Sequence, residues 1–109
     1  MIYITNTSII PQNYEGAVEI SNVSLPYVKE LLEKYEFQSA IGHESTASLL
    51  TRILGIEIKM NRVQIEVVEG DVILAFQLKK RLQEAAELSE EELKSLEYSF
   101  REIRFSQKL

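Results

Sequence analysis

The residues best suited to catalysis lie in one short segment, residues 41–46, with the sequence IGHEST. Histidine is the side chain that most readily exchanges a proton near neutral pH, and His43 is the only histidine in the chain. Gly42 permits a close approach of the backbone to a ligand. A helix that begins here leaves its first N–H groups unpaired, and such groups attract phosphate. With the hydroxyls of Ser45 and Thr46, the segment favours phosphodiester chemistry. The alternative is that His43 or Glu44 only caps a helix and that the two hydroxyl residues are ordinary first-turn residues.

A second polar group follows an apolar run and comprises Gln77, Lys79, Lys80, Arg81 and Glu84. Arg81 and Glu84 are three positions apart, which suits an ion pair on one helical turn or two side chains that reach the same ligand. The planar guanidinium of arginine also suits a phosphate. The alternative is a basic strand end that is exposed to solvent.

A third candidate group is Asn6, Thr7 and Ser8, directly after the first predicted strand. Their short polar side chains either hydrogen-bond a ligand or form a turn. None of the three groups identifies a reaction alone, so the elements that position them must be considered.

Length and composition restrict the class of protein. The chain has 109 residues, of which 45 % are hydrophobic and 27 % charged, as expected for one globular domain. It has no cysteine, which excludes disulfides and thiolate metal sites, and a single histidine excludes a site of several imidazoles in one chain. No apolar stretch approaches the roughly 20 residues needed to cross a bilayer, and the start does not resemble a signal peptide. We expect a cytoplasmic protein that does not contact membranes.

The net charge of −5 is unevenly distributed. Residues 84–97 contain six acids and one base, whereas the rest of the chain contains 11 of each. The acidity argues against binding to duplex nucleic acid, which normally requires a basic face. Because the excess charge lies in one segment, a local anion site elsewhere remains compatible with the sequence.

Short apolar runs predict a sheet. We expect strands at Ile2–Thr5, Ala17–Ser21 and 100–105, and a hairpin in which residues 63–67 pair with residues 72–78 through the turn at 69–71. In the run 72–78 apolar residues point to both faces, which is typical of a central strand.

Three helices are predicted from their ends. Ser24 is expected to cap the first, a second begins near His43 and stops at Gly55, and Ser89 with Glu92 forms a capping box for the third. The glutamates around Glu92 are then mostly solvated helix surface. The prediction is an α/β protein of the α+β type: one compact domain, residues 1–109, with a mixed sheet of about five strands flanked by about three helices.

Together these motifs resemble the viral ring nucleases that act as type III anti-CRISPR proteins, a family with relatives in phages and integrated mobile elements. The resemblance rests on the segment IGHEST, on Asn61-Arg62-Val63, and on the pair Arg81 and Glu84 after a strand that ends in Gln77. It implies a homodimer that binds the second messenger cyclic tetra-adenylate and cleaves it without a metal or cofactor.

The resemblance also implies roles for individual residues. The catalytic histidine corresponds to His43, and the arginine and glutamate that support binding and cleavage correspond to Arg81 and Glu84. Residues expected to contact the ligand are Asn6, Ser8, Ser45, Gln77 and Arg81. The other hypothesis is a noncatalytic dimeric binding or regulatory protein of a virus or mobile element, either a sponge for the messenger or a module that binds nucleic acid or protein.

Overall fold

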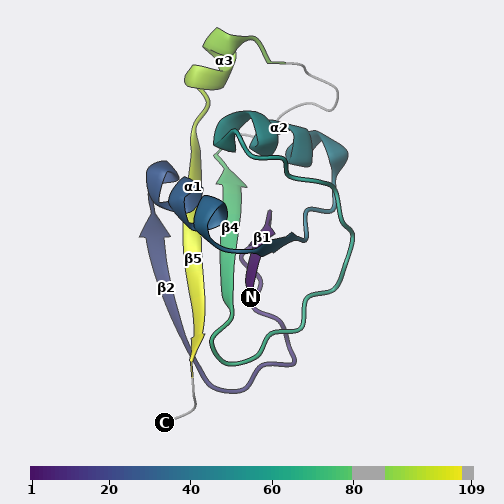
Figure 1. The fold of residues 1–109 in the computed structure, drawn as a ribbon, viewed down its shortest axis with the longest axis vertical. Helices are drawn as coiled ribbons and strands as arrows, with labels where there is room; N and C mark the ends of the chain where they lie inside the picture. The colour runs from purple at the N-terminus through teal and green to yellow at the C-terminus, as the bar shows by residue number, and fades with distance from the viewer. Residues whose placement is uncertain (80–87, 107–109) are drawn as a thin grey trace.

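The computed structural model describes residues 1–79 and 88–106. In this part of the chain, five strands form one sheet and three helices pack around it (Figure 1). The strands are β1 (Ile2–Thr5), β2 (Ala17–Val23), β3 (Phe37–Ser39), β4 (Val72–Leu78) and β5 (Tyr98–Ser106), and the helices are α1 (Leu25–Lys34), α2 (Glu44–Leu54) and α3 (Glu90–Lys94). The predicted α+β class is therefore confirmed.

The sheet is mixed, with the strand order β2-β5-β4-β1-β3. β1 runs parallel to both of its neighbours, β4 and β3. β5 runs antiparallel to β4 and to β2. β4 is central, as its two-faced apolar pattern predicted, because both of its edges are paired. β3 was not predicted, since three residues are too few to show a periodic pattern.

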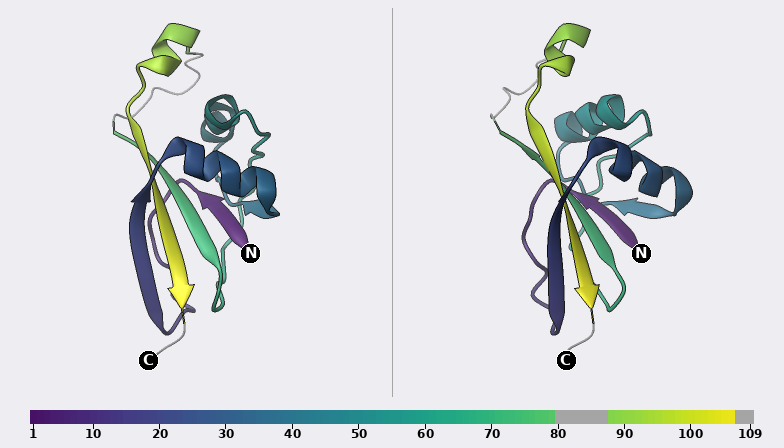
Figure 2. Two further views of the ribbon diagram at one scale, coloured as in Figure 1. Left: turned by 60° about the vertical axis from the view of Figure 1, so that its left-hand side comes forward. Right: turned by 90° about the vertical axis from the view of Figure 1, so that its left-hand side faces the viewer.

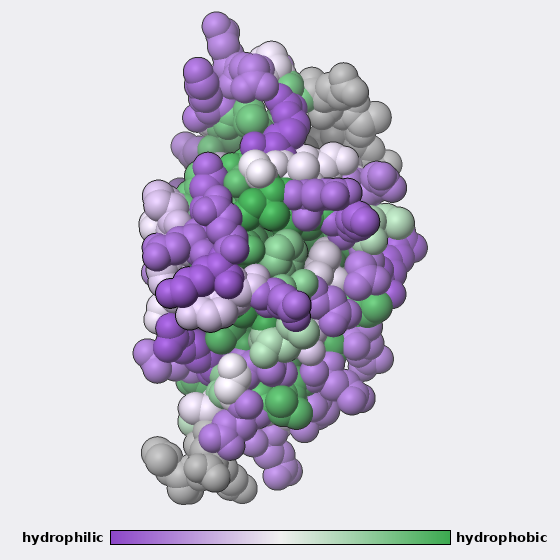
Figure 3. Space-filling view, in the orientation of Figure 1, coloured by the Kyte–Doolittle hydropathy of each residue, from purple (hydrophilic) through white to green (hydrophobic). Residues whose placement is uncertain are grey.

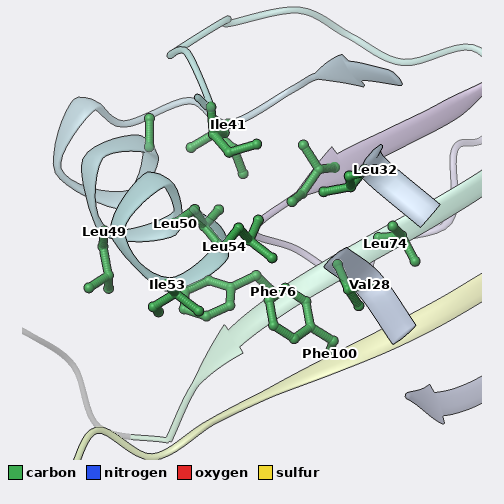
Figure 4. Close-up of a cluster of buried hydrophobic side chains, with 13 residues drawn as sticks. Val28, Leu32, Ile41, Leu49, Leu50, Ile53, Leu54, Leu74, Phe76 and Phe100 are labelled. Carbon is green, nitrogen blue, oxygen red and sulfur yellow. The ribbon is translucent and has the colours of Figure 1, made fainter. Parts of the chain in front are cut away.

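The helices α1 and α2 cover one face of the sheet (Figure 2). Between them and the sheet lies the larger hydrophobic core, whose side chains are shown in Figure 4. Val28 from α1, Leu50 from α2 and Leu74 from β4 have no solvent-exposed surface. Burial of each such side chain contributes about 1.5–3 kcal/mol to folding, so this core holds α2 in place above the strands.

The other face of the sheet carries a smaller core. Ile73 and Phe105 lie on this face, and Tyr14, Ile65 and Val67 pack against them. Tyr14 belongs to the loop 6–16, which Figure 2 shows on the side of the sheet opposite α1 and α2. Loop segments therefore cover this face, whereas helices cover the first face.

The predicted hairpin is wrong. Residues 63–67 form no strand, although β4 begins after the predicted turn. The physical reason is that β1 and β5 already occupy both edges of β4, so no hydrogen-bonding edge is left for a further partner. The apolar residues Ile65 and Val67 pack onto a face of the sheet instead.

Most predicted ends of elements are confirmed. The side chain of Ser24 accepts a hydrogen bond from the N–H of Tyr27 at the start of α1, and both hydrogen bonds of the capping box at Ser89 are present. Gly55 ends α2 in the left-handed conformation, with φ of 69°. The strands β2 and β5 extend by a few residues beyond the predicted ranges.

No helix in the described residues is both long enough and apolar enough to cross a membrane.

A buried carboxylate joins α1 to the sheet. Glu102 of β5 is only 5 % exposed, and its carboxylate accepts hydrogen bonds from the Tyr27 hydroxyl and the Arg104 guanidinium. Arg104 also donates to the Tyr27 oxygen at 3.3 Å. Both partners stabilise the fold, because a buried carboxylate that lacks a hydrogen bond lowers the free energy of unfolding.

We expect Tyr27→Phe to lower the free energy of unfolding by about 1–3 kcal/mol, because a buried oxygen of Glu102 loses its hydroxyl donor. The hydrogen bond to Glu102 raises the pKa of Tyr27 above 10.0. The stabilisation is therefore complete below pH 10 and is lost as the pH rises through the raised pKa, where wild type and variant converge. Urea denaturation at several pH values measures this difference. Tyr35→Phe, at an exposed tyrosine, serves as the control, and equal stability of Tyr27→Phe and wild type would contradict the prediction.

Candidate functional site

Three parallel strands bring the predicted site segments to one edge of the sheet. β1 lies between β4 and β3, and its last paired positions are Thr5 opposite Ala75 and Ile4 opposite Ser39. Parallel strands end at the same edge of a sheet, so the segments after β1 and β3 leave the sheet side by side, and the N–H of Ala40 donates to the carbonyl oxygen of Ile4. Asn6 directly follows β1, Gln77 lies near the end of β4, and residues 40–42 connect β3 to His43.

The polar residues after β1 form a turn whose outer positions face solvent. The Thr5 hydroxyl donates to the carbonyl oxygen of Thr7 at 2.8 Å, and the N–H of Ile9 donates to the Thr7 hydroxyl at 3.3 Å. Asn6 is exposed and Ser8 is half-buried. The turn that was the alternative for this segment is therefore present, and its hydrogen bonds come from Thr5 and Thr7. The side-chain amide of Asn6 makes no hydrogen bond to the described residues.

Gln77 lies on the sheet face opposite the helices. It alternates with the buried residues Leu74 and Phe76 of the helix-covered core and shares its face with Ile73 and Ala75. Its side chain is exposed. The candidate ligand residues on β4 and after β1 are thus accessible from outside the core.

His43 occupies the N-cap position of α2. Its backbone is extended, with φ of −129° and ψ of 133°, and its carbonyl accepts the first helical hydrogen bond, from Ala47 at 3.1 Å. The imidazole is exposed and makes no capping hydrogen bond. His43 is therefore the N-cap residue, as the alternative predicted, but its side chain makes no capping hydrogen bond. The N–H groups of Glu44, Ser45 and Thr46 precede the first helical donor, so they are available to an anion.

The structure adds Arg62 to this group. Its Nε donates to the carbonyl oxygen of Gly42 at 2.8 Å, which places a guanidinium beside the residue that precedes His43. Arg62 belongs to the stretch Asn61-Arg62-Val63 that carries the resemblance, but its residue type alone predicted no contact with the segment before His43. A Cβ at Gly42 would meet only Arg62 Cγ, at 3.9 Å, among the described residues, and the close approach to a ligand stays a prediction.

Arg81 and Glu84 lie outside the described residues. The chain is described up to Lys79, two positions beyond Gln77. The predicted ion pair between Arg81 and Glu84 therefore stays a prediction.

A cavity of about 550 Å³ lies at the other end of α2, where this helix meets the end of β4 and the start of β5. It is lined by Arg52, Ile53, Lys79, Leu93, Lys94, Leu96, Glu97 and Tyr98. Figure 3 shows the hydrophobic side chains between α2 and α3 framed by hydrophilic ones. Burial raises the pKa of Tyr98. Lys79, a member of the second polar group, lines this cavity, whereas His43, Asn6 and Gln77 do not.

The fold defines a small α+β protein with an exposed histidine at the start of the helix that follows β3. The sequence model of the STIV B116-like family matches residues 2–100, and the chain belongs to this family.

Relatives come from archaeal viruses and from a bacterium. The chain is 40 % identical over 102 residues to uncharacterized protein 26 of Sulfolobus islandicus filamentous virus, covering 91 % of this chain and 86 % of the relative. It is 32 % identical over 87 residues to the uncharacterized protein YddF of Bacillus subtilis, covering 78 % and 81 %. Its structure is similar to B116 of Sulfolobus turreted icosahedral virus, with a TM-score of 0.80 and 27 % identity over 94 % of this chain and 97 % of that one.

The unused cap position predicts a gain in stability on substitution. Serine is a good N-cap residue, and a serine side chain at this position can accept a hydrogen bond from the first turn of α2. We expect His43→Ser to raise the free energy of unfolding by about 0.5–2 kcal/mol. The comparison with His43→Ala, which adds no acceptor, isolates this effect in urea denaturation. A destabilised His43→Ser protein would show that the imidazole supports the helix.

Proposed function

We propose that this protein is a ring nuclease that binds cyclic tetra-adenylate and cleaves it to linear diadenylate, thereby removing the second messenger of type III CRISPR defence. The observation that supports it best is the exposed His43 at the start of α2, whose imidazole makes no capping hydrogen bond and which follows β3, the parallel neighbour of β1. Unpaired N–H groups and the guanidinium of Arg62 supply positive potential at the same place.

The reaction uses the 2′-hydroxyl of the RNA as the nucleophile. The hydroxyl loses its proton to solvent water while its oxygen attacks the adjacent phosphorus, the bond from phosphorus to the 5′-oxygen breaks, and a 2′,3′-cyclic phosphate forms. His43 acts as the general acid that protonates the leaving 5′-oxygen. The N–H groups of Ser45 and its neighbours and the guanidinium of Arg81 stabilise the charge on phosphate. Glu84 orients Arg81.

Binding and positioning are assigned to the polar residues at the sheet edge. Asn6, Ser8 and Gln77 hydrogen-bond the ring, and Ser45 contacts a phosphate through its hydroxyl. In-line alignment of the 2′-oxygen with the bond that breaks supplies further rate. The chemistry requires no cofactor and no bound metal, because the nucleophile is part of the substrate.

The proposed assembly is a homodimer, in which two copies of the site face a ring that has a twofold axis. Val18 and Ile20 of β2 support it. They pair with Phe105 and Ile103 across the strands, so they lie on the sheet face opposite the helices, yet they are 37 % and 47 % exposed. A second copy packed against β2 on this face would bury them.

The central test is incubation of the purified protein with labelled cyclic tetra-adenylate in EDTA, with analysis of both retention and products. We expect wild type to yield linear products and His43→Ala to retain the ring while cleaving it about 10²–10⁴-fold more slowly, because it lacks the general acid. Cleavage by His43→Ala at the wild-type rate would exclude the assigned role. Retention without cleavage by wild type would identify a sponge, and neither retention nor cleavage would favour a module for another partner.

The dimer is tested by a charge placed on the exposed sheet face. Ile20→Lys should shift the sedimenting species from dimer to monomer, because a lysine would have to be buried in the interface. Ser21→Lys is the matched control, since Ser21 is exposed on the same strand and points to the opposite side of the sheet. A wild-type protein that sediments as a monomer would exclude the proposed assembly.

A further inference from the structure

We propose that Asn61 is a positioning residue for His43. It fixes the segment 39–42, which connects β3 to α2, and thereby sets where the imidazole stands relative to the ligand. This inference rests on the proposed function for its effect on cleavage, and it assigns to Asn61 no contact with the substrate.

Asn61 holds two carbonyl groups of the connecting segment. Its backbone N–H donates to the carbonyl oxygen of Ile41 at 2.8 Å, and its side-chain Nδ2 donates to the carbonyl oxygen of Ser39 at 2.7 Å. The side-chain bond joins residues 22 positions apart, so it is a tertiary contact. Its donor amide is half-buried, and its length is typical of a well-formed hydrogen bond.

Neighbouring residues reinforce the same contact. The Ser39 hydroxyl donates to the carbonyl oxygen of Lys59 at 2.6 Å, Ile41 forms a parallel bridge with Met60, and Arg62 Nε donates to the carbonyl oxygen of Gly42. Residues 59–62 therefore hold the segment that leads to His43 through backbone and side-chain hydrogen bonds.

The segment has little other support. β3 has three residues and is at the edge of the sheet, and past its end the N–H of Ala40 donates to the carbonyl oxygen of Ile4 at 2.9 Å. Ile41 is fully buried and anchors the segment by packing. Packing fixes the position of this anchor, but hydrogen bonds fix the direction of the peptide planes that follow it. Removing the amide of Asn61 should thus reorient residues 39–43 without unfolding the domain.

Asn13 offers a matched control. Its Nδ2 donates to the carbonyl oxygen of Val67 at 3.0 Å, and its Oδ1 accepts from the N–H of the same residue at 3.3 Å. It is also an asparagine that ties one loop to a distant segment through the backbone, but it binds no residue of the segment 39–43. A loss of stability that is common to both variants therefore cancels in the comparison.

The kinetic test compares Asn61→Ala with Asn13→Ala in cleavage of cyclic tetra-adenylate. We expect Asn61→Ala to lower kcat roughly 10–100-fold while KM changes by less than about threefold, since the acid is misplaced and the ligand contacts remain. Asn13→Ala should keep the wild-type kcat. Asn61→Asp keeps the shape of the side chain and removes the donor, so it should lower kcat as Asn61→Ala does. It replaces the alanine variant in this test if Asn61→Ala does not fold. A wild-type kcat in a folded Asn61 variant overturns the proposal.

A second measurement needs no substrate. Because the chain has one histidine, the imidazole of His43 gives a single set of NMR signals. Asn61→Ala should shift these signals and Asn13→Ala should leave them unchanged. If wild type does not cleave the ring, the proposed function fails and the NMR comparison alone decides on Asn61. Unchanged imidazole signals in Asn61→Ala overturn the positioning role.

Discussion

The parallel pairing of β1 with both β4 and β3 is the constraint on which the candidate site depends. β1 has only four residues, but Ile4 is fully buried and fixes the strand between its two neighbours. Because all three strands run the same way, the segments after them meet at one edge although they are far apart in sequence. If β1 ran in the opposite direction, Asn6 would lie at the far end of the sheet from Gln77. The hydrophobic core around β1 thus determines which polar residues become neighbours.

The second constraint acts on the approach to His43. β3 is too short to hold the chain up to the start of α2, and residues 59–62 supply the missing hydrogen bonds from outside the sheet. Residues 65–67 follow the same logic on the other face, where they pack onto the sheet because β4 has no free edge. The stretch 56–71 therefore has no regular strand, yet it supports the site at one end and covers the smaller core at the other.

Local chemistry explains what the sequence could predict. Helix ends are defined by contacts between residues three or four positions apart, as at Ser24, at Gly55 and at the pair Ser89 and Glu92. Both partners of each contact therefore lie within one short stretch of sequence. The two-faced apolar pattern of β4 likewise indicated a central strand.

The predictions that were wrong or missing concern pairing between distant parts of the chain. The hairpin was predicted because turn and alternation are local signals, whereas the strands that exclude it, β1 and β5, come from distant parts of the chain. Asn61 and Arg62 act through backbone carbonyls of residues 39–42, and carbonyl partners leave no trace in residue type. The candidate residues Asn6, His43 and Gln77 could be selected by chemistry, but only the topology shows that Gln77 lies on the sheet face opposite α2.

The start of α2 shows how stability and the candidate chemistry are separated within one helix. An N-cap position is normally occupied by a residue whose side chain accepts a hydrogen bond, and His43 does not supply one. The helix tolerates this because helices in proteins are stabilised mainly by packing of their apolar face, and Leu50, Ile53 and Leu54 bury that face against the sheet. The stabilising contacts are concentrated in the later turns, so the first turn is free to present N–H groups and an imidazole to solvent. In the acidic segment, Glu90, Glu91 and Glu92 lie in α3, and Glu90 pairs with Arg52 in the last turn of α2, away from its first turn. An anion can therefore approach that turn even though the whole chain is negatively charged.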